Sequence, residues 1–222
     1  MQEVVIAGAS RTPMGGFQGA LAPLDAPTLG GHAIRAALST SGADPLRVEE
    51  LMMGCVLPAG QGQAPARQSG FHAGLGQQVP ANTLNKMCGS GMMAAMLAHD
   101  RIALGVASLI VAGGMESMTN APYLLPKMRG GARLGHAQAL DHMFLDGLED
   151  AYDRGRLMGT FAEDAALEDN SVGIGERVGR AKSFDNVIAR FRLKPMHVLI
   201  PSVLDRNELV SFGLNLSEQR WG

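Results

Sequence analysis

Short apolar runs alternate with longer amphipathic segments through the first half of the chain. Apolar runs of about four to eight residues bounded by glycine or proline predict buried strands, whereas apolar residues three and four apart predict helices. The pattern predicts strands within residues 4–13, 48–57, 81–87 and 108–116, and helices within residues 26–41, 66–75 and 92–107. Strands that alternate with helices favour an α/β fold whose mixed sheet is largely parallel and carries helices on both faces.

The predicted helix 92–107 is apolar around most of its circumference, so we expect it to be buried. Cys88 lies in the turn before it, where unpaired backbone N–H groups and the helix dipole favour a thiolate. Gly89 and Gly91 leave room for a substrate carbonyl beside the sulfur. Two interpretations follow: Cys88 is a nucleophile for covalent catalysis, or it is a small buried residue before a helix.

Other side chains with reactive groups have simpler explanations. Cys55 alternates with apolar residues along a predicted strand and is expected in the core. Glu116 follows a strand, at the end of a parallel sheet where active sites cluster, but it could equally hydrogen-bond a loop backbone. His136, Asp141 and His142 match no established ligand spacing, so no metal site is predicted.

The pattern changes after Pro122. Residues 127–136 are basic, rich in glycine and without a period, and residues 141–151 are acidic and mixed. Long segments of this kind tend to be functional or to mediate assembly. We therefore expect an excursion from the sheet.

Composition excludes several classes of function. The net charge of −2 gives no electrostatic case for binding nucleic acid or an anionic membrane. Two cysteines do not suggest a disulfide framework, which favours a reducing compartment. The first residues carry no basic leader, and no apolar stretch reaches membrane-spanning length. These observations predict a cytoplasmic protein.

Six segments carry sequences typical of one enzyme family: residues 5–15, 65–68, 85–92, 111–123, 142–152 and 157–164. The most specific are Cys-Gly-Ser-Gly at 88–91 and Gly-Gly-Met-Glu-Ser-Met at 113–118. On these residues the chain resembles the thiolase family, and within it the acetyl-CoA C-acetyltransferases. The resemblance is nearly continuous from residue 4 to residue 164.

The resemblance implies the N-terminal half of a thiolase-like fold with an incomplete sheet, plus an excursion into the loop domain that holds coenzyme A. It implies an acyltransferase that condenses two acetyl-CoA into acetoacetyl-CoA, or cleaves a 3-ketoacyl-CoA, through an acyl group on Cys88. The coenzyme A thioester is the substrate, and no cofactor is implied. Met158 resembles a methionine of the acyl pocket, and Leu157 stands where some relatives place a histidine that contacts coenzyme A.

The same resemblance implies assembly. Residues 82–87 look like the strand that pairs across a dimer, and residues 122–146 look like the loop through which the family forms tetramers. A homodimer or homotetramer is therefore expected of a complete protein.

The resemblance stops after Asp164. Residues 165–222 contain no Asn-Glu-Ala-Phe-type segment, no Gly-His-Pro and no second Cys-x-Gly. In the family these motifs hold an oxyanion-site water, activate the first cysteine and deprotonate the attacking acetyl group. Full condensation by this chain is therefore expected to be impaired.

The chain is predicted to divide into three regions: a thiolase-like core at 1–121, a partial loop region at 122–164 and a non-matching tail at 165–222. The tail has two interpretations. It could form a short helix at 184–191 and an apolar strand at 196–204, bordered by His197, in which Pro201 would suit an edge strand only. Alternatively it is a poorly ordered, out-of-frame or unrelated sequence, which the sharp break favours.

Two rival functions remain at this point. The chain could be a non-catalytic, thiolase-derived assembly module, because both assembly segments are present. It could instead be a condensing enzyme like the ketoacyl synthases, which also use a cysteine, although residues 113–119 and 157–164 favour a thiolase.

Overall fold

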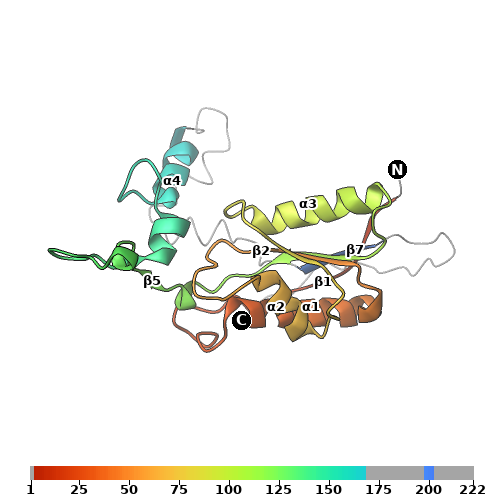
Figure 1. Ribbon diagram of the computed structural model, residues 1–222. Helices are drawn as coiled ribbons and strands as arrows, with labels where there is room; N and C mark the ends of the chain where they lie inside the picture. Colours follow the sequence, from red (N-terminus) through yellow and green to blue (C-terminus); the bar gives the residue numbers. More distant parts are fainter. Residues whose placement is uncertain (1–2, 169–197, 203–222) are drawn as a thin grey trace.

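A five-stranded mixed sheet forms the centre of the described part of the chain (Figure 1). The computed structural model describes residues 3–168 and 198–202. The strands are β1 (Val5–Ser10), β2 (Glu50–Gly54), β3 (Ala81–Leu84), β4 (Ile110–Gly114) and β7 (Val198–Ser202), in the spatial order β1-β7-β4-β2-β3. β2 pairs in parallel with β3 and β4, whereas β7 runs antiparallel to β1 and β4. The predicted mixed, largely parallel sheet is confirmed.

Helices cover both faces of the sheet, as predicted. α1 (Ala26–Ser41) and α2 (Pro65–Ala73) pack on one face, and α3 (Ser90–Ala103) packs on the other (Figure 1). Successive residues of a strand point to opposite faces. Accordingly, Val111 belongs to the core cluster with α1, and its neighbours Ile110 and Ala112 belong to the cluster with α3.

The bounds of α1 follow from local sequence. The Asp25 carboxylate accepts a hydrogen bond from Thr28 N at 2.8 Å and caps the first turn, which also contains Pro27. Hydrogen bonding by Thr28, chiefly through its side chain and further through this backbone N–H, lowers the pKa of Asp25. The helix ends at Gly42, whose φ of 68° lies in the left-handed region.

The prediction that α3 is buried on all sides is wrong. The helix buries the face that contains Ala94, Ala98 and Ile102, while Met92 and Met96 are 71% and 53% exposed. No described segment covers the face of these methionines. A helix that is apolar around its circumference can be buried, but each face is buried only where another segment packs against it.

The expectation that Pro201 lies in an edge strand is also wrong, since β7 lies between β1 and β4. Proline lacks the N–H that a central strand normally donates. Here Pro201 is opposite Ile6, next to an irregularity in the register between Ile6 and Gly8, and β7 pairs with β4 only between Leu199 and Ala112. The interrupted ladder accommodates the proline. The predicted helix 184–191, His197 and the rest of the tail lie outside the described residues.

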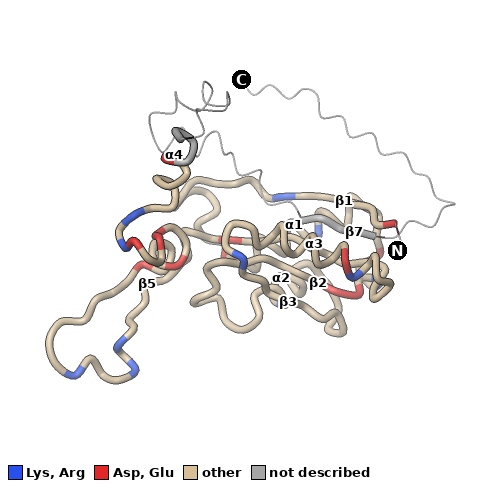
Figure 2. The backbone as a smooth tube through the Cα atoms, turned by 90° about the horizontal axis from the view of Figure 1, so that it is seen from above, with Lys and Arg blue, Asp and Glu red and all other residues tan. Residues whose placement is uncertain are grey.

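The chain leaves the sheet after β4. A hairpin of β5 (Tyr123–Leu124) and β6 (Leu140–Asp141) projects from the body, with lysine and arginine residues along its loop (Figure 2). A π-helix (Phe144–Leu148) and α4 (Met158–Glu168) follow. Short 3-10 turns lie at Pro45–Arg47, Met118–Asn120 and Met128–Gly130. No helix within the described residues is long and apolar enough to cross a membrane.

Candidate active site

Cys88 lies in a tight turn between β3 and α3. β3 ends at Leu84, and α3 begins at Ser90 with Gly89 as its N-cap. The predicted arrangement of strand, turn and helix is confirmed. The residue is exposed, which argues against the interpretation of Cys88 as a small core residue.

The turn is held by its own side chains. Ser90 Oγ accepts a hydrogen bond from Lys86 N at 2.8 Å and donates one to Met87 O at 2.5 Å. Asn85 Oδ1 accepts a hydrogen bond from Met87 N at 3.0 Å. Met87 adopts a φ of +49°, which is uncommon for a residue with a long side chain and persists only where neighbouring contacts enforce it. These contacts fix the backbone immediately before Cys88.

Glycines let the start of α3 approach the sheet closely. A Cβ on Gly54, the last residue of β2, would lie 2.6 Å from Ser90 Cβ and 2.7 Å from Gly91 N. Gly91 lies beside the last residues of β4, and a Cβ on it would be 3.6 Å from Gly113. Cys88 is therefore mounted at the carboxyl ends of parallel strands, where ligand sites of α/β sheets are found.

This geometry supports part of the chemistry of a nucleophile. The N-terminus of a 14-residue helix stabilises negative charge, and the thiolate is the reactive form of cysteine. Among the described residues, no histidine or carboxylate makes a hydrogen bond with Cys88. The described residues thus place Cys88 at the start of a helix but place no proton acceptor at hydrogen-bond distance from its sulfur.

The second cysteine has a different environment. Cys55 is buried, as predicted, and its thiol lies 3.6 Å from Glu116 Oε1 and 3.8 Å from Gln61 Oε1. Burial and the negative charge of Glu116 raise the pKa of Cys55 to about 12. Cys55 is therefore protonated at neutral pH and is a poor nucleophile.

Glu116 hydrogen-bonds a loop backbone, one of the two alternatives that the sequence left open. Its Oε2 accepts a hydrogen bond from Val56 N at 2.8 Å, and its Oε1 accepts one from Leu57 N at 3.0 Å. Burial raises the pKa of Glu116, while these two backbone N–H groups oppose the rise. Within the described structure, Glu116 forms no hydrogen bond with Cys88.

His142 is buried near the same loop. Its Nδ1 lies 2.6 Å from Asp146 Oδ2, and its Nε2 accepts a hydrogen bond from Ala59 N at 3.4 Å. Both ring nitrogens are thus occupied by protein partners. Within the described ranges, no group of three or more His, Cys, Asp or Glu side chains is arranged to hold a metal ion.

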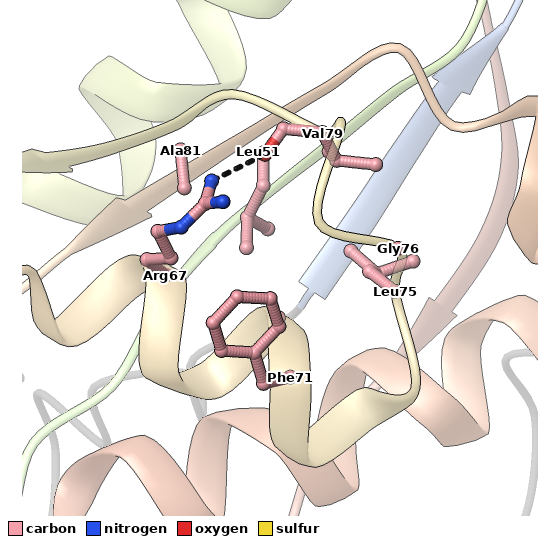
Figure 3. A pocket seen from close by; sticks show the side chains of 8 residues that line it. Leu51, Arg67, Phe71, Leu75, Gly76, Val79 and Ala81 are labelled. Carbon is pink, nitrogen blue, oxygen red and sulfur yellow. Dashed lines mark hydrogen bonds between the residues drawn. The ribbon is translucent and has the colours of Figure 1, made fainter.

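Two cavities lie among the described residues near the sheet, and Cys88 lines neither of them. One, of about 10 Å³, has room for a single water and lies between α2 and β2 (Figure 3). Arg67 lines it and donates a hydrogen bond to Val79 O at 3.0 Å (Figure 3). Arg67 also donates one to Gln77 O at 2.6 Å, and its guanidinium carbon lies 5.0 Å from the Phe71 ring centre. A wider one, of about 280 Å³, is lined by residues of 11–33.

Leu157 and Met158 lie at the start of α4, in the segment after the π-helix. Leu157 O accepts a hydrogen bond from Thr160 Oγ1 at 2.7 Å, and Met158 is half exposed. No hydrogen bond in the described structure connects either residue with the turn of Cys88. Their predicted contacts with the acyl group and coenzyme A stay predictions.

Four further residues, to which the sequence motifs give no role, contribute to the site: Asn85, Ser90, Gln61 and Gly54. Asn85 and Ser90 flank Cys88 directly, and both residue types commonly hydrogen-bond local backbone, so this signal was present. Gln61 contacts Cys55 and Leu57 a few residues before it in the same loop. Gly54 acts through a contact with the distant Ser90, for which a single sequence gives no signal.

The comparison with known families decides the classification. The family model described as "Thiolase, N-terminal domain" matches residues 4–171. The chain belongs to the thiolase family. This membership favours the thiolase interpretation over a ketoacyl-synthase-like enzyme.

Relatives of this thiolase-family chain include two bacterial acetyl-CoA acetyltransferases. The protein from Cupriavidus necator is 50% identical over 168 residues, which cover 76% of this chain and 42% of the relative. The protein from Pseudomonas aeruginosa is 51% identical over 166 residues, covering 75% and 42%.

A third acetyl-CoA acetyltransferase, from Chromobacterium violaceum, is 43% identical over 207 residues, covering 90% of this chain and 52% of the relative. Coverage of 90% requires that part of residues 165–222 is aligned, at a lower overall identity than in the shorter matches. The chain spans between about two-fifths and half of the length of these three relatives. The division at residue 164 stays a prediction.

Proposed function

We propose that Cys88 accepts the acetyl group of acetyl-CoA in a thiolase-type acyl transfer. The thiolate would attack the thioester carbonyl, form a new C–S bond, and expel coenzyme A, whose sulfur then takes up a proton. The observation that carries this proposal is the exposed Cys88, fixed in a tight turn at the start of α3. Relatives named acetyl-CoA acetyltransferases support the choice of the acyl group.

In the complete reaction, a second acetyl-CoA would be deprotonated and joined to the acetyl group on Cys88 to give acetoacetyl-CoA, or the reverse cleavage would use coenzyme A. Deprotonation of an acetyl group needs a positioned base and stabilisation of the resulting oxyanion. Residues 1–222 contain neither Gly-His-Pro nor a second Cys-x-Gly. We expect these residues by themselves to stop after acylation, with Met158 beside the acyl group and Leu157 beside coenzyme A.

The test is to locate the acetyl group after incubation of the purified chain with acetyl-CoA. Trypsin cleaves after Lys86 and Arg101, so Cys88 falls in peptide 87–101, whereas Cys55 falls in peptide 48–67. We expect one acetyl group on peptide 87–101 and release of one coenzyme A, measured by mass spectrometry of a brief tryptic digest near neutral pH that is then acidified to preserve the thioester.

Two variants control this experiment. Cys88→Ala should remove the acetylation completely, and Cys55→Ala should leave it in place because the buried thiol is protonated. Acetylation that survives in Cys88→Ala, or that is absent from a folded wild-type chain, would contradict the proposed role of Cys88. Formation of acetoacetyl-CoA by the 222-residue chain would contradict the expected arrest after acylation.

A second candidate function is that of an assembly module, and the position of β3 favours it. Within the described sheet β3 pairs only with β2 and is the last strand of the order. An edge strand presents unpaired backbone groups that can pair with another chain. Residues 82–87 could therefore join this chain to a second copy, or to a full-length relative, with the loop 122–146 extending the contact.

The test of this second function is co-elution. The 222-residue chain is mixed with the acetyl-CoA acetyltransferase from Cupriavidus necator, and the mixture is separated by size-exclusion chromatography. An assembly module should appear in the fractions of the larger protein, and Met92→Lys, on the exposed face of α3, should not prevent it because β3 is unchanged. Separate elution at micromolar concentrations would exclude this function.

A further inference from the structure

Glu116 begins a series of contacts that crosses the carboxyl ends of three parallel strands. The residue follows β4, and its carboxylate accepts the hydrogen bonds from Val56 N and Leu57 N, in the segment after β2. The backbone also connects the two strand ends, because Met115 N donates to Gly54 O at 2.9 Å. The segment 55–57 is thus tied to the end of β4.

The same segment holds the residues before Cys88. Cys55 N donates a hydrogen bond to Leu84 O, the last residue of β3, at 2.9 Å. Asn85 Nδ2 donates to Val56 O at 3.4 Å, and Asn85 Oδ1 accepts from Met87 N at 3.0 Å. Two side-chain contacts through Asn85 therefore connect the loop held by Glu116 with the residue that precedes Cys88.

The Glu116 carboxylate supplies the hydrogen-bond acceptors that a neighbouring strand or helix would otherwise provide to residues 56 and 57. Residues 55–57 lie outside β2 and any helix, so the N–H groups of Val56 and Leu57 find their acceptors in a side chain from another strand end. A buried N–H group that loses its acceptor costs free energy, and a loop with such a group rearranges to find another. Glutamine at position 116 offers only one acceptor oxygen and would leave one of these N–H groups facing an amide.

We propose that Glu116 is a positioning residue that fixes Cys88 at the N-terminus of α3 through residues 55–57 and Asn85. The proposal rests on the proposed function in so far as Cys88 is the reactive thiol. Glu116 takes no part in bond formation. Its effect is on where the sulfur is held, and this can be measured without acetyl-CoA.

The test is the pH dependence of Cys88 alkylation by iodoacetamide, followed on peptide 87–101 in the full chain. In Glu116→Gln the sulfur should lose its fixed place at the helix N-terminus. We expect the rate profile to move in the direction of slower reaction, with the rate at neutral pH falling by about tenfold, because cysteines held at helix N-termini are reactive. A simple effect of charge has the opposite sign, because loss of an anion favours the charged thiolate and speeds the reaction.

Asn85→Ala is the second variant. Asn85 is exposed, so its replacement breaks the last connection without disturbing the buried cluster around Glu116. It should move the profile in the same direction as Glu116→Gln, and the double variant should be no slower than the slower single variant, since both interrupt one series of contacts. Cys55→Ala removes the thiol beside Glu116 but keeps both backbone hydrogen bonds, and should leave the profile unchanged.

The outcomes separate this proposal from the proposed function. An unchanged profile in Asn85→Ala overturns the connection to Cys88 even if Glu116→Gln does not fold, and a faster reaction in Glu116→Gln overturns it in favour of charge alone. If wild-type chain is never acetylated by acetyl-CoA but the alkylation profiles shift as expected, the proposed function fails and the positioning role of Glu116 stands.

Discussion

Gly54→Ala is expected to lower the free energy of unfolding by about 2–3 kcal/mol, the upper part of the range for overpacking. The new Cβ would lie 2.6 Å from Ser90 Cβ and 2.7 Å from Ser90 C, so the start of α3 has to move away from the sheet. The same movement should slow the reaction of Cys88, which is two residues before Ser90. Urea unfolding measures the first effect, and iodoacetamide alkylation of peptide 87–101 measures the second.

Gly91→Ala is the matched control on the other side of this contact. A Cβ at Gly91 would lie 3.6 Å from Gly113, which is an ordinary van der Waals distance. Alanine also favours a helix over glycine by roughly 0.5–1 kcal/mol. We therefore expect Gly91→Ala to be as stable as the wild type or more stable. Equal unfolding midpoints for the two variants would show that α3 does not approach β2 as closely as described.

The second large effect is expected for Ser90→Ala, which should cost about 2 kcal/mol of stability and loosen the turn of Cys88. Ser90 is buried, and its Oγ pairs with both Lys86 N and Met87 O. Alanine removes the acceptor of Lys86 N, whereas Met87 O keeps the hydrogen bond from the backbone N of residue 90 at 2.9 Å. A buried backbone group that loses its partner costs about 1–3 kcal/mol. The left-handed conformation of Met87 would lose one of the contacts that hold it. Urea unfolding and the alkylation rate of Cys88 check these expectations.

Ser69→Ala serves as the control for burial of a serine. Ser69 is fully buried in α2, but its Oγ makes one hydrogen bond, to Ala66 O of the same helix. Alanine is the better helix former, which offsets part of the lost bond. The variant should lose less than about 1 kcal/mol and leave Cys88 alkylation unchanged. If Ser69→Ala slowed alkylation as much as Ser90→Ala, the effect at Ser90 would reflect general loosening and not the turn.

Local signals predicted much of the fold and the candidate nucleophile. Asp25, Pro27 and Gly42 mark the ends of α1, and its predicted range of residues 26–41 is the observed one. The glycines around Cys88 predict a turn, and the structure has this turn between β3 and α3. Such signals act between residues close in sequence, so a single chain displays them.

The errors concern contacts between distant segments. The apolar pattern of α3 predicts burial of the face with Met92 and Met96, yet burial depends on a partner that the helix sequence does not specify. Under one of the two interpretations of the tail, Pro201 suits an edge strand only, whereas the irregular pairing of β1 accommodates it inside the sheet. The sequence does not decide between a catalytic and a backbone-binding role for Glu116, because its partners, Val56 and Leu57, are about sixty residues away in the chain.

Among the described residues, the contacts that hold the turn of Cys88 join residues between Gly54 and Glu116. During synthesis on a ribosome, chains fold from the N-terminal side as they emerge. All partners of the turn are therefore available to the nascent chain as soon as Glu116 has left the exit tunnel. Changes to the reading frame downstream of this residue leave every one of those partners in place.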